Sequence, residues 1–454
     1  MPARPNAKLN CRSGGSNAEV HDKSFYIRNS TFNIRHCFST LSPFCTFNKA
    51  IILFTLHFLL FTALFSQVRV GADRLFSDEF HTVAGKRVGL VTNHTAVLSN
   101  GRHLADSLFG HPSVTLAALF GPEHGIRGQV PAGGKVGDGT DPTTGVRVFS
   151  LYGASYKPTP EMLRGIDVLL FDIQAVGARF YTYISTMSYA MEAAAENGIP
   201  FVVLDRPNPI TGTRVEGFVR EDSVKSFVGL HPIPIVHGMT MGELAKMFNE
   251  EGWLKGGIRA DLTVVKMEGW KRGMWFDETG LEWIPPSPNM RTIATAVVYP
   301  GTCLIEGTNL SEGRGTDRPF EYIGAPFVDG ARWAGELNEL GLPGVKFSAI
   351  TFTPRPTIGG SNPKHAGIQC NGIIVEVTDR EVYEPVKTGV EILSTGKELF
   401  AKDFRWRESS IDRLAGTPLV RQGIDKRVSG MSIANASVDK LRIFMQNRLL
   451  HLLY

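Results

Sequence analysis

Short apolar runs of strand length alternate with amphipathic segments from Lys86 onward. The runs RVGLVTN, VTLAALF and DVLLFDIQ are almost continuously apolar, which is typical of strands buried on both faces of a sheet. VRVFSLYG and PFVVLDRPNP have the same character. Because these strands alternate with helical segments, the sequence predicts an α/β fold with a Rossmann-like, mostly parallel sheet.

The segments between these runs carry helix start and stop signals. NGRHLADSLFG ends at Gly110, and TYISTMSYAMEAAAENG ends at Gly198. TPEMLRGI combines a threonine N-cap with a proline and a glutamate in its first turn. We therefore expect a helix in each segment.

The pattern changes after about residue 240. TMGELAKMFNEEGW predicts a capped helix and DLTVVKMEGW a strand, whereas residues 272–320 are rich in Gly, Pro, Thr and Arg. Further along, VKFSAITFTP and GIIVEVTD alternate like strands, and VKTGVEILSTGKELF repeats like a helix. We predict a Rossmann-like catalytic domain over residues 73–240 and a smaller mixed α/β domain over residues 241–454 that completes a cleft.

Residues 1–72 differ from this body. They are polar and basic up to Lys49 and then contain the apolar run AIILFTLHFLLFTALF at residues 50–65. The run fits the core of a signal peptide and is slightly short for a spanning helix. It predicts an exported protein, periplasmic or extracellular, that is either cleaved near Ala72 or anchored to the membrane by residues 50–66.

The composition narrows the classes of function. The chain has 454 residues, 43% hydrophobic and 20% charged, with a net charge of +4, which suits a globular protein. No polybasic cluster points to nucleic acid as a partner. No Cys/His spacing for a metal, glycine-rich nucleotide loop or GxSxG elbow is found, so we expect neither a metal nor a cofactor.

Polar side chains follow the predicted parallel strands, at the edge where ligands bind in open α/β sheets. The first strand leads to Asn93 and His94, the second to Glu123, His124 and Arg127, the fourth to Asp172, Gln174, Arg179, Tyr181 and Tyr183, and the fifth to Asp205 and Arg206. If the sheet forms, these carboxylates, arginines and aromatic rings share one site.

Several of these residues also have a structural interpretation. Asp205 could stabilise a turn or pair with Arg206, Asp172 could be a hydrogen-bonded strand end, and Asn93 could serve a turn. One of the two tyrosines could belong to the core. Glu123 fits a structural role least well, because it lies outside any amphipathic helix and its glycine neighbours allow a ligand to approach.

Two later segments add candidates for substrate binding. His237 lies just before the helix that begins near Thr240, where a structural histidine is the alternative. Residues 305–320, IEGTNLSEGRGTDRPF, place Glu306, Asn309 and Arg314 in a glycine-rich loop. Charges of both signs beside an aromatic residue fit a polar ligand better than an ordinary surface loop.

Seven segments together resemble one family. They are GLVTNHTAV, LFGPEHGIRG, FDIQAVGARFYTY, LDRPNP, HGMTMGELA, EGTNLSEGRGTDRPF and the closing LLY. They are similar to the NamZ-type exo-β-N-acetylmuramidases, glycoside hydrolase family 171, over about residues 72–454. The resemblance implies a Rossmann-like domain and a smaller domain around a cleft, and release of N-acetylmuramic acid from the non-reducing ends of peptidoglycan fragments. It also implies that Glu123, in the GPEHG motif, is the catalytic acid.

The candidate residues suit such a substrate. Glycoside hydrolysis uses a second carboxylate, for which Asp172, Asp205 and Glu306 are candidates. N-acetylmuramic acid carries a lactyl carboxylate that a guanidinium binds bidentately, so Arg127, Arg179 and Arg314 could recognise it. Tyr181 or Tyr183 could stack on the sugar ring. The expected partners are oligosaccharides or muropeptides derived from peptidoglycan.

Two other functions remain open at this point. An amidase or esterase acting on cell-wall peptides could use His124 or His237 as its base, although the serine elbow and a zinc site are missing. A non-catalytic module that binds muropeptides would need the same cleft. The sequence does not determine the oligomeric state.

Overall fold

The computed structural model describes residues 67–128, 137–357 and 361–454. The predicted signal peptide or anchor at residues 50–66 lies outside this part of the chain. The described residues all belong to one compact unit. Among the described residues, no helix is long and apolar enough to cross a bilayer.

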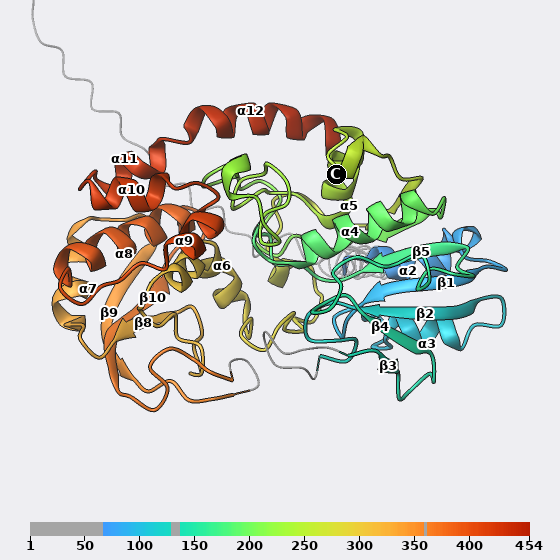
Figure 1. Ribbon diagram of the computed structural model, residues 1–454, viewed down its shortest axis with the longest axis horizontal. Helices are drawn as coiled ribbons and strands as arrows, with labels where there is room; N and C mark the ends of the chain where they lie inside the picture. Colours follow the sequence, from blue (N-terminus) through green and yellow to red (C-terminus); the bar gives the residue numbers. More distant parts are fainter. Residues whose placement is uncertain (1–66, 129–136, 358–360) are drawn as a thin grey trace, which may run out of the picture. The chain divides into compact units, whose positions relative to one another are not determined.

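The blue-to-green part of the chain in Figure 1 contains a seven-stranded sheet with the order β3-β4-β2-β1-β5-β6-β7. Six strands are parallel, and the short edge strand β3 runs antiparallel to β4. The strands are β1 Arg87–Thr92, β2 Thr115–Gly121, β3 Gly139–Thr140, β4 Arg147–Ser150, β5 Val168–Asp172, β6 Phe201–Leu204 and β7 Leu262–Val265. The prediction of a mostly parallel sheet is confirmed. After β1, the chain first adds β2 and β4 on one side of this strand and then β5, β6 and β7 on its other side. The point at which the strand order reverses therefore lies between β1 and β5.

Helices cover both faces of this sheet because the strands are apolar on both. Along β5, Val168 and Leu170 join one core cluster, and Leu169 and Phe171 join the other. The first face packs against α2 Gly71–Ser77 and α3 Leu104–Phe109, and the second against α4 Tyr183–Glu196 and α5 Met241–Glu250.

Two details differ from the sequence-based picture. TPEMLRGI forms hydrogen-bonded turns and no helix, although Thr159 Oγ1 accepts a hydrogen bond from the Met162 amide. Strand β7 joins the large sheet by pairing with β6. The sheet therefore extends beyond residue 240, and the domain boundary placed there does not coincide with its edge.

The start of the described chain is part of the fold. Val68, Val70 and Ala72 are buried, and Ala72 lies inside α2. Cleavage after Ala72 would remove Val68 and Val70 from the core. The folded body therefore begins before the cleavage position expected from the sequence.

The second half of the chain forms a three-stranded antiparallel sheet in the order β8-β10-β9, with its own helices. The prediction of a smaller mixed α/β part is confirmed. The strands are β8 Tyr322–Ala325, β9 Val345–Phe352 and β10 Cys370–Val377. The helices are α6 Ile293–Thr302, α7 Gly330–Glu339, α8 Pro385–Leu399, α9 Glu408–Ala415, α10 Leu419–Asp425, α11 Gly430–Asn435 and α12 Val438–Arg448.

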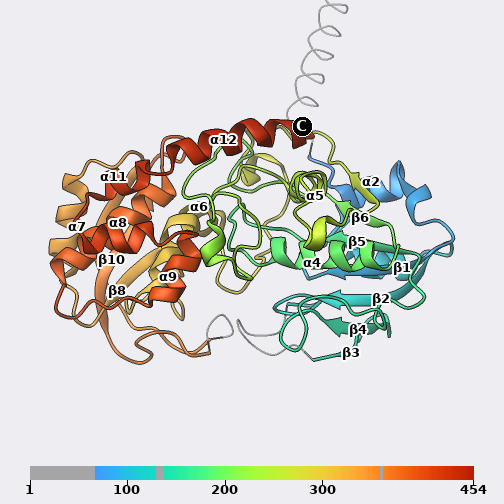
Figure 2. The same cartoon turned by 45° about the horizontal axis from the view of Figure 1, so that its top comes forward.

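Helix α12 returns the chain to the first half. It runs from α11 toward α5 in Figures 1 and 2, and the short 3₁₀ turn η7, Leu449–His451, packs on α5. His451 contacts Glu250 and Glu251 at the end of α5, at 2.9 and 3.0 Å. The last helix therefore connects the two halves of the compact unit.

Helices α6 and α8 approach closely because each presents a glycine to the other. A methyl group on Gly389 would lie 2.4 Å from the carbonyl oxygen of Gly301, and one on Gly301 would lie 1.8 Å from that of Pro385. Backbone carbonyls at such distances leave no room for a side chain. The helix contact therefore requires glycine at both positions.

We expect Gly389→Ala to lower the free energy of unfolding by about 1–3 kcal/mol, because the added methyl group forces α6 and α8 apart. Urea unfolding followed by circular dichroism measures this change. Gly335→Ala in α7 is the matched control, since a methyl group there meets nothing within 4 Å. The control should gain about 0.5–1 kcal/mol from helix propensity. Equal stability of both variants would contradict the packing argument.

Candidate active site

The loop after β2 turns sharply and presents Glu123. His124 and Gly125 have φ values of +73° and +74°, and Gly128 has φ +72°. A methyl group on Gly128 would lie 2.6 Å from Nδ1 of His94, so the loop can pack on this imidazole only with glycine there. His94 Nε2 in turn lies 2.8 Å from the carbonyl oxygen of Pro285. The contacts fix the loop and leave Glu123 half-buried at its tip.

Glu123 lines two adjoining cavities. The inner one, of about 200 Å³, is walled by the aromatic rings of Tyr152, Phe180, Tyr181, Tyr183, Tyr299 and Phe320. The outer one, of about 600 Å³, is lined by charged side chains, such as Glu312, Lys364 and Arg413, together with apolar ones, such as Phe227 and Pro363. Both are lined by Glu123, Val228, Glu306, Arg314 and Leu414. We therefore treat them as one site with an aromatic inner part and a charged entrance.

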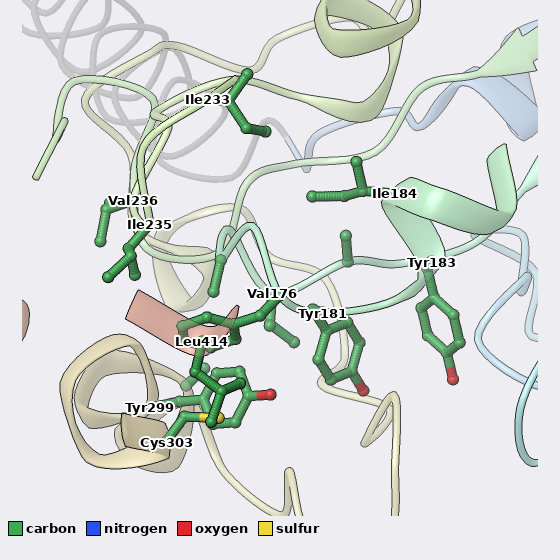
Figure 3. Close-up of a cluster of buried hydrophobic side chains, with 14 of the residues drawn as sticks. Val176, Tyr181, Tyr183, Ile184, Ile233, Ile235, Val236, Tyr299, Cys303 and Leu414 are labelled. Carbon is green, nitrogen blue, oxygen red and sulfur yellow. The ribbon is translucent and has the colours of Figure 1, made fainter. Parts of the chain in front are cut away.

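The inner cavity is built from both halves of the chain. Tyr181 lies just before α4, and Tyr299 and Cys303 come from α6 and its extension. Leu414 comes from α9. Figure 3 shows Tyr299, Cys303 and Leu414 gathered beneath Val176, with Tyr181 beside them. The cavity therefore forms only when both halves are folded together.

A network of alternating charges lines the cavity opposite the loop of Glu123. Arg314 Nη2 donates to Glu306 Oε1 at 2.6 Å, and its Nε lies 3.4 Å from Glu312 Oε1. Lys364 Nζ lies 3.0 Å from Glu312 Oε2. Although burial opposes a charge on Glu312, Lys364 and Arg314 hold its pKa below the ordinary value. The neighbouring carboxylates likewise raise the pKa of Arg314 despite burial. Glu312 and Arg314 are therefore both ionised at neutral pH.

Tyrosine hydroxyls surround Glu123. Burial raises the pKa of Tyr152, and the charge of Glu123 and a hydrogen bond between the two side chains raise it further. Burial also raises the pKa of Tyr181, whose ring lies 5.0 Å from that of Tyr183. These hydroxyls stay protonated, so they can donate hydrogen bonds to a carboxylate or a sugar oxygen.

The structure brings together the residues predicted from three separate segments. Glu123, His124, Tyr181, Tyr183, Glu306 and Arg314 all line the inner cavity. Tyr183 is also tied to the fold, because its hydroxyl donates to the carbonyl oxygen of Pro286 at 2.7 Å.

The strand-end carboxylates lie elsewhere and have structural partners. Asp172 is fully buried and forms a bidentate ion pair with Arg206, whose Nη2 lies 2.9 Å from Asp172 Oδ2. Asp205 is also fully buried and accepts hydrogen bonds from Thr240, Gly242 and Tyr454. Neither carboxylate lines the two cavities: Asp172 neutralises Arg206, and Asp205 is held by uncharged hydrogen-bond donors at the carboxyl end of the sheet.

Two arginines predicted to recognise the lactyl group hold the fold together. Arg127 pairs with Asp106 and Asp141, at 2.7 and 2.8 Å. Arg179 is fully buried and donates to the carbonyl oxygens of Phe218, Ile233 and Leu414. Their guanidinium groups are occupied by these contacts, which leaves Arg314 as the predicted arginine at the cavity.

The remaining candidates also bond to neighbouring protein groups. Asn93 accepts from Thr95, and Gln174 donates to the carbonyl oxygens of Ala175 and Pro207. His237 accepts from the Met239 amide, and burial lowers its pKa to about 3. Asn309 bridges Asp403 and Arg405. These polar residues follow strands or begin helices because they satisfy backbone groups there.

Several residues that line the site were not predicted from the sequence. Glu312 lies in the glycine-rich segment 305–320 that was predicted to bind a polar ligand, so the sequence could have indicated this residue as well. Tyr152, Tyr299, Lys364 and Arg413 carried no comparable signal. Lys364 reaches Glu312 from more than 50 positions along the chain, and Arg413 enters from α9. Only the folded chain shows that they are neighbours.

Comparisons with known proteins agree with this architecture. The family model "Exo-beta-N-acetylmuramidase NamZ, N-terminal" matches residues 88–294, and the corresponding C-terminal model matches residues 297–454. A peptidoglycan beta-N-acetylmuramidase NamZ of Bacillus subtilis is 50% identical over 394 residues, which cover 87% of this chain and 93% of the relative.

Two crystal structures of DUF1343 family proteins from Bacteroides fragilis are also similar. The first has a TM-score of 0.79 and 37% identity, and the second has 0.71 and 33%. Each match covers 86% of this chain and 99% of the other.

The buried carboxyl of Asp205 should make stability depend on pH. Burial raises its pKa from 3.8 to about 7, outweighing the hydrogen bonds from Thr240 and Gly242 that lower it. The folded state therefore binds a proton that the unfolded chain releases at lower pH, and this contribution to stability declines as pH rises from about 4 to about 7. Urea unfolding of wild type and Asp205→Asn across this range should show a steeper decline for wild type. Parallel profiles would contradict the assignment.

Proposed function

The chain belongs to the family of NamZ exo-β-N-acetylmuramidases, and on this premise we propose that it hydrolyses the bond that joins a terminal N-acetylmuramic acid to a peptidoglycan fragment. The observation that carries the proposal is the pair of carboxylates, Glu123 and Glu306, that line the same aromatic cavity. Glycoside hydrolysis needs two carboxyl groups on either side of the scissile bond.

The two carboxylates occupy different environments, which suits different roles. Glu306 accepts a hydrogen bond from the guanidinium group of Arg314. We assign Glu306 as the nucleophile or the base that activates water. Glu123 lies among the tyrosine hydroxyls and aromatic rings of the inner cavity. We assign it as the acid that protonates the leaving oxygen.

The shape and charge of the site suit a single acidic sugar. An inner cavity of about 200 Å³ with aromatic walls fits one pyranose ring, and aromatic faces commonly pack against sugars. Arg314, Lys364 and Arg413 provide cations near the lactyl carboxylate of N-acetylmuramic acid. The wider outer cavity would hold the remainder of the fragment.

The alternative functions receive less support. His124 lines the inner cavity, but His237 is buried and bonded to the backbone of its own turn. Ser287 lines the inner cavity, and its side chain hydrogen-bonds with that of Tyr181. A module that only binds muropeptides would give no free sugar, which the first experiment tests.

We expect Glu123→Gln to fold normally and to lose about 100-fold or more of its activity on a disaccharide of N-acetylmuramic acid and N-acetylglucosamine. The loss should be much smaller on an aryl muramoside, because an aryl leaving group needs little protonation. Glu306→Gln should lose activity on both substrates. Release of free N-acetylmuramic acid is the readout, and Glu336→Gln on α7 is the control. Equal losses on both substrates for Glu123→Gln would remove the acid role.

Arg314→Lys tests recognition of the lactyl group. Lysine keeps a cation beside Glu306 and Glu312 but cannot bind a carboxylate bidentately. We expect kcat/KM to fall about tenfold more on an aryl N-acetylmuramide than on the matching N-acetylglucosaminide. Arg318→Lys, which keeps its pairing with Glu321 outside the cavity, is the matched control. Equal losses on the two sugars would show that Arg314 serves only Glu306 and Glu312.

A further inference from the structure

Two carboxylates at the wall of the site share one guanidinium group. Arg314 Nη2 donates to Glu306 Oε1 at 2.6 Å, while its Nε lies 3.4 Å from Glu312 Oε1. The side chain of Glu312 is 5% exposed, and that of Glu306 is 30% exposed. Opposite charges attract more strongly where water is excluded, so Glu312 should be the stronger competitor for Arg314. Nevertheless, the shorter contact is with Glu306.

A second cation beside Glu312 explains this arrangement. Lys364 Nζ lies 3.0 Å from Glu312 Oε2, the carboxylate oxygen on the side away from the Arg314 contact. The ammonium group neutralises Glu312, so Arg314 is available to Glu306. Without Lys364, two carboxylates would share one cation. Since a buried carboxylate that has lost its partner is costly, Arg314 would turn toward Glu312.

The backbone around Glu306 holds Lys364 in place. Its Nζ donates to the carbonyl oxygens of Ile305 at 3.0 Å and Leu310 at 2.8 Å. The next residue, His365, places its Nε2 2.8 Å from the carbonyl oxygen of Asn309. These contacts fix the ammonium group against the same segment that carries both glutamates. They also give Lys364 a structural role as a support for this backbone, which an experiment has to separate from its effect on Arg314.

We propose that Lys364 is a positioning residue, which neutralises Glu312 and thereby keeps Arg314 paired with Glu306 in the cavity. The proposal rests on the function proposed above, in which Glu306 is the nucleophile or base and Arg314 recognises the lactyl carboxylate. Loss of the Lys364 charge then removes the guanidinium from both of these groups at once. Lys364 acts through Arg314 and needs no contact with the sugar.

The test compares Lys364→Met in two backgrounds, the wild-type chain and Glu312→Gln. In the wild-type chain we expect kcat/KM for an aryl N-acetylmuramide to fall about tenfold or more. In the Glu312→Gln chain the same substitution should cost about twofold or less, because no carboxylate remains to draw Arg314 away from Glu306. A merely structural lysine would not produce this difference, since the carbonyl oxygens of Ile305 and Leu310 lose their donor in both backgrounds.

Lys387→Met is the matched control. Its side chain is 19% exposed, against 13% for Lys364, and it pairs with Glu384, but it belongs to α8 and lines neither cavity. This variant should keep the wild-type kcat/KM. Circular dichroism checks that each variant folds. If Lys364→Met does not fold, Lys364→Gln takes its place in the same comparison, because glutamine is uncharged and still offers an N–H donor to the carbonyl oxygens.

A crystal structure of Lys364→Met tests the position of Arg314 without a measurement of activity. The guanidinium group should leave Glu306 and form its shorter contact with Glu312. A wild-type protein that releases no N-acetylmuramic acid would refute the proposed function, and the position of Arg314 in this variant would still decide the role of Lys364.

Three results would overturn the proposal. The first is a Lys364→Met variant with the wild-type kcat/KM. The second is an equal loss in the wild-type and Glu312→Gln backgrounds, because Lys364 then supports only the backbone. The third is a crystal structure of Lys364→Met in which Arg314 keeps its hydrogen bond to Glu306.

Discussion

The buried carboxylate of Asp205 connects the three parts of the chain on which the site depends. Asp205 directly follows β6. Its carboxyl oxygens accept hydrogen bonds from the Gly242 amide in the first turn of α5, from the Thr240 hydroxyl and from the hydroxyl of the last residue, Tyr454. A carboxyl that water cannot reach must find its donors within the protein. Its partners come from the sheet, the following helix and the C-terminus, so the end of the chain closes against the large sheet.

The requirement that a buried charged group has partners within the protein explains which charged residues serve the fold and which serve the site. Asp172 and Arg206 neutralise each other at the carboxyl ends of β5 and β6, and Arg127 is neutralised by Asp106 and Asp141. Charges directly at strand ends are buried by the covering helices and become structural. Glu123 lies on the loop beyond β2, Glu306 lies in the 3₁₀ turn Cys303–Gly307, and Arg314 lies in the segment that follows this turn. The candidate chemistry therefore comes from segments outside the large sheet, where cavities remain.

The two halves of the chain contribute different residues to the cavity. The first half supplies the acidic loop and the tyrosines Tyr181 and Tyr183 at the start of α4, and the second half supplies Glu306, Arg314 and Tyr299 of α6. The close contact between α6 and α8 through Gly301 and Gly389 holds the second set in position. In the function we propose, the open side of this site takes the longer fragment and the enclosed side holds one sugar.

The sequence by itself determined most of the large sheet. Continuous apolar runs identify β1, β2, β4, β5 and β6 because a strand covered on both faces must be apolar on both faces. It also marked Glu123, whose glycine neighbours and lack of helical periodicity indicated an exposed functional loop. The glycine-rich segment at 305–320 marked Glu306 and Arg314 for the same reason.

Only the tertiary structure decided which strand-end residues are structural. Asp172, Asp205 and Arg179 have the same residue types and spacing as catalytic or binding groups, and the difference lies in partners far away in the sequence. These partners are Tyr454 for Asp205, Leu414 for Arg179 and Arg206 for Asp172. No local sequence pattern encodes these contacts. The segment TPEMLRGI likewise carries a local capping signal but forms turns and no helix. Packing against neighbouring elements decides whether a helix continues. Local pattern fixes the elements, whereas the pairing of buried charges is a property of the whole fold.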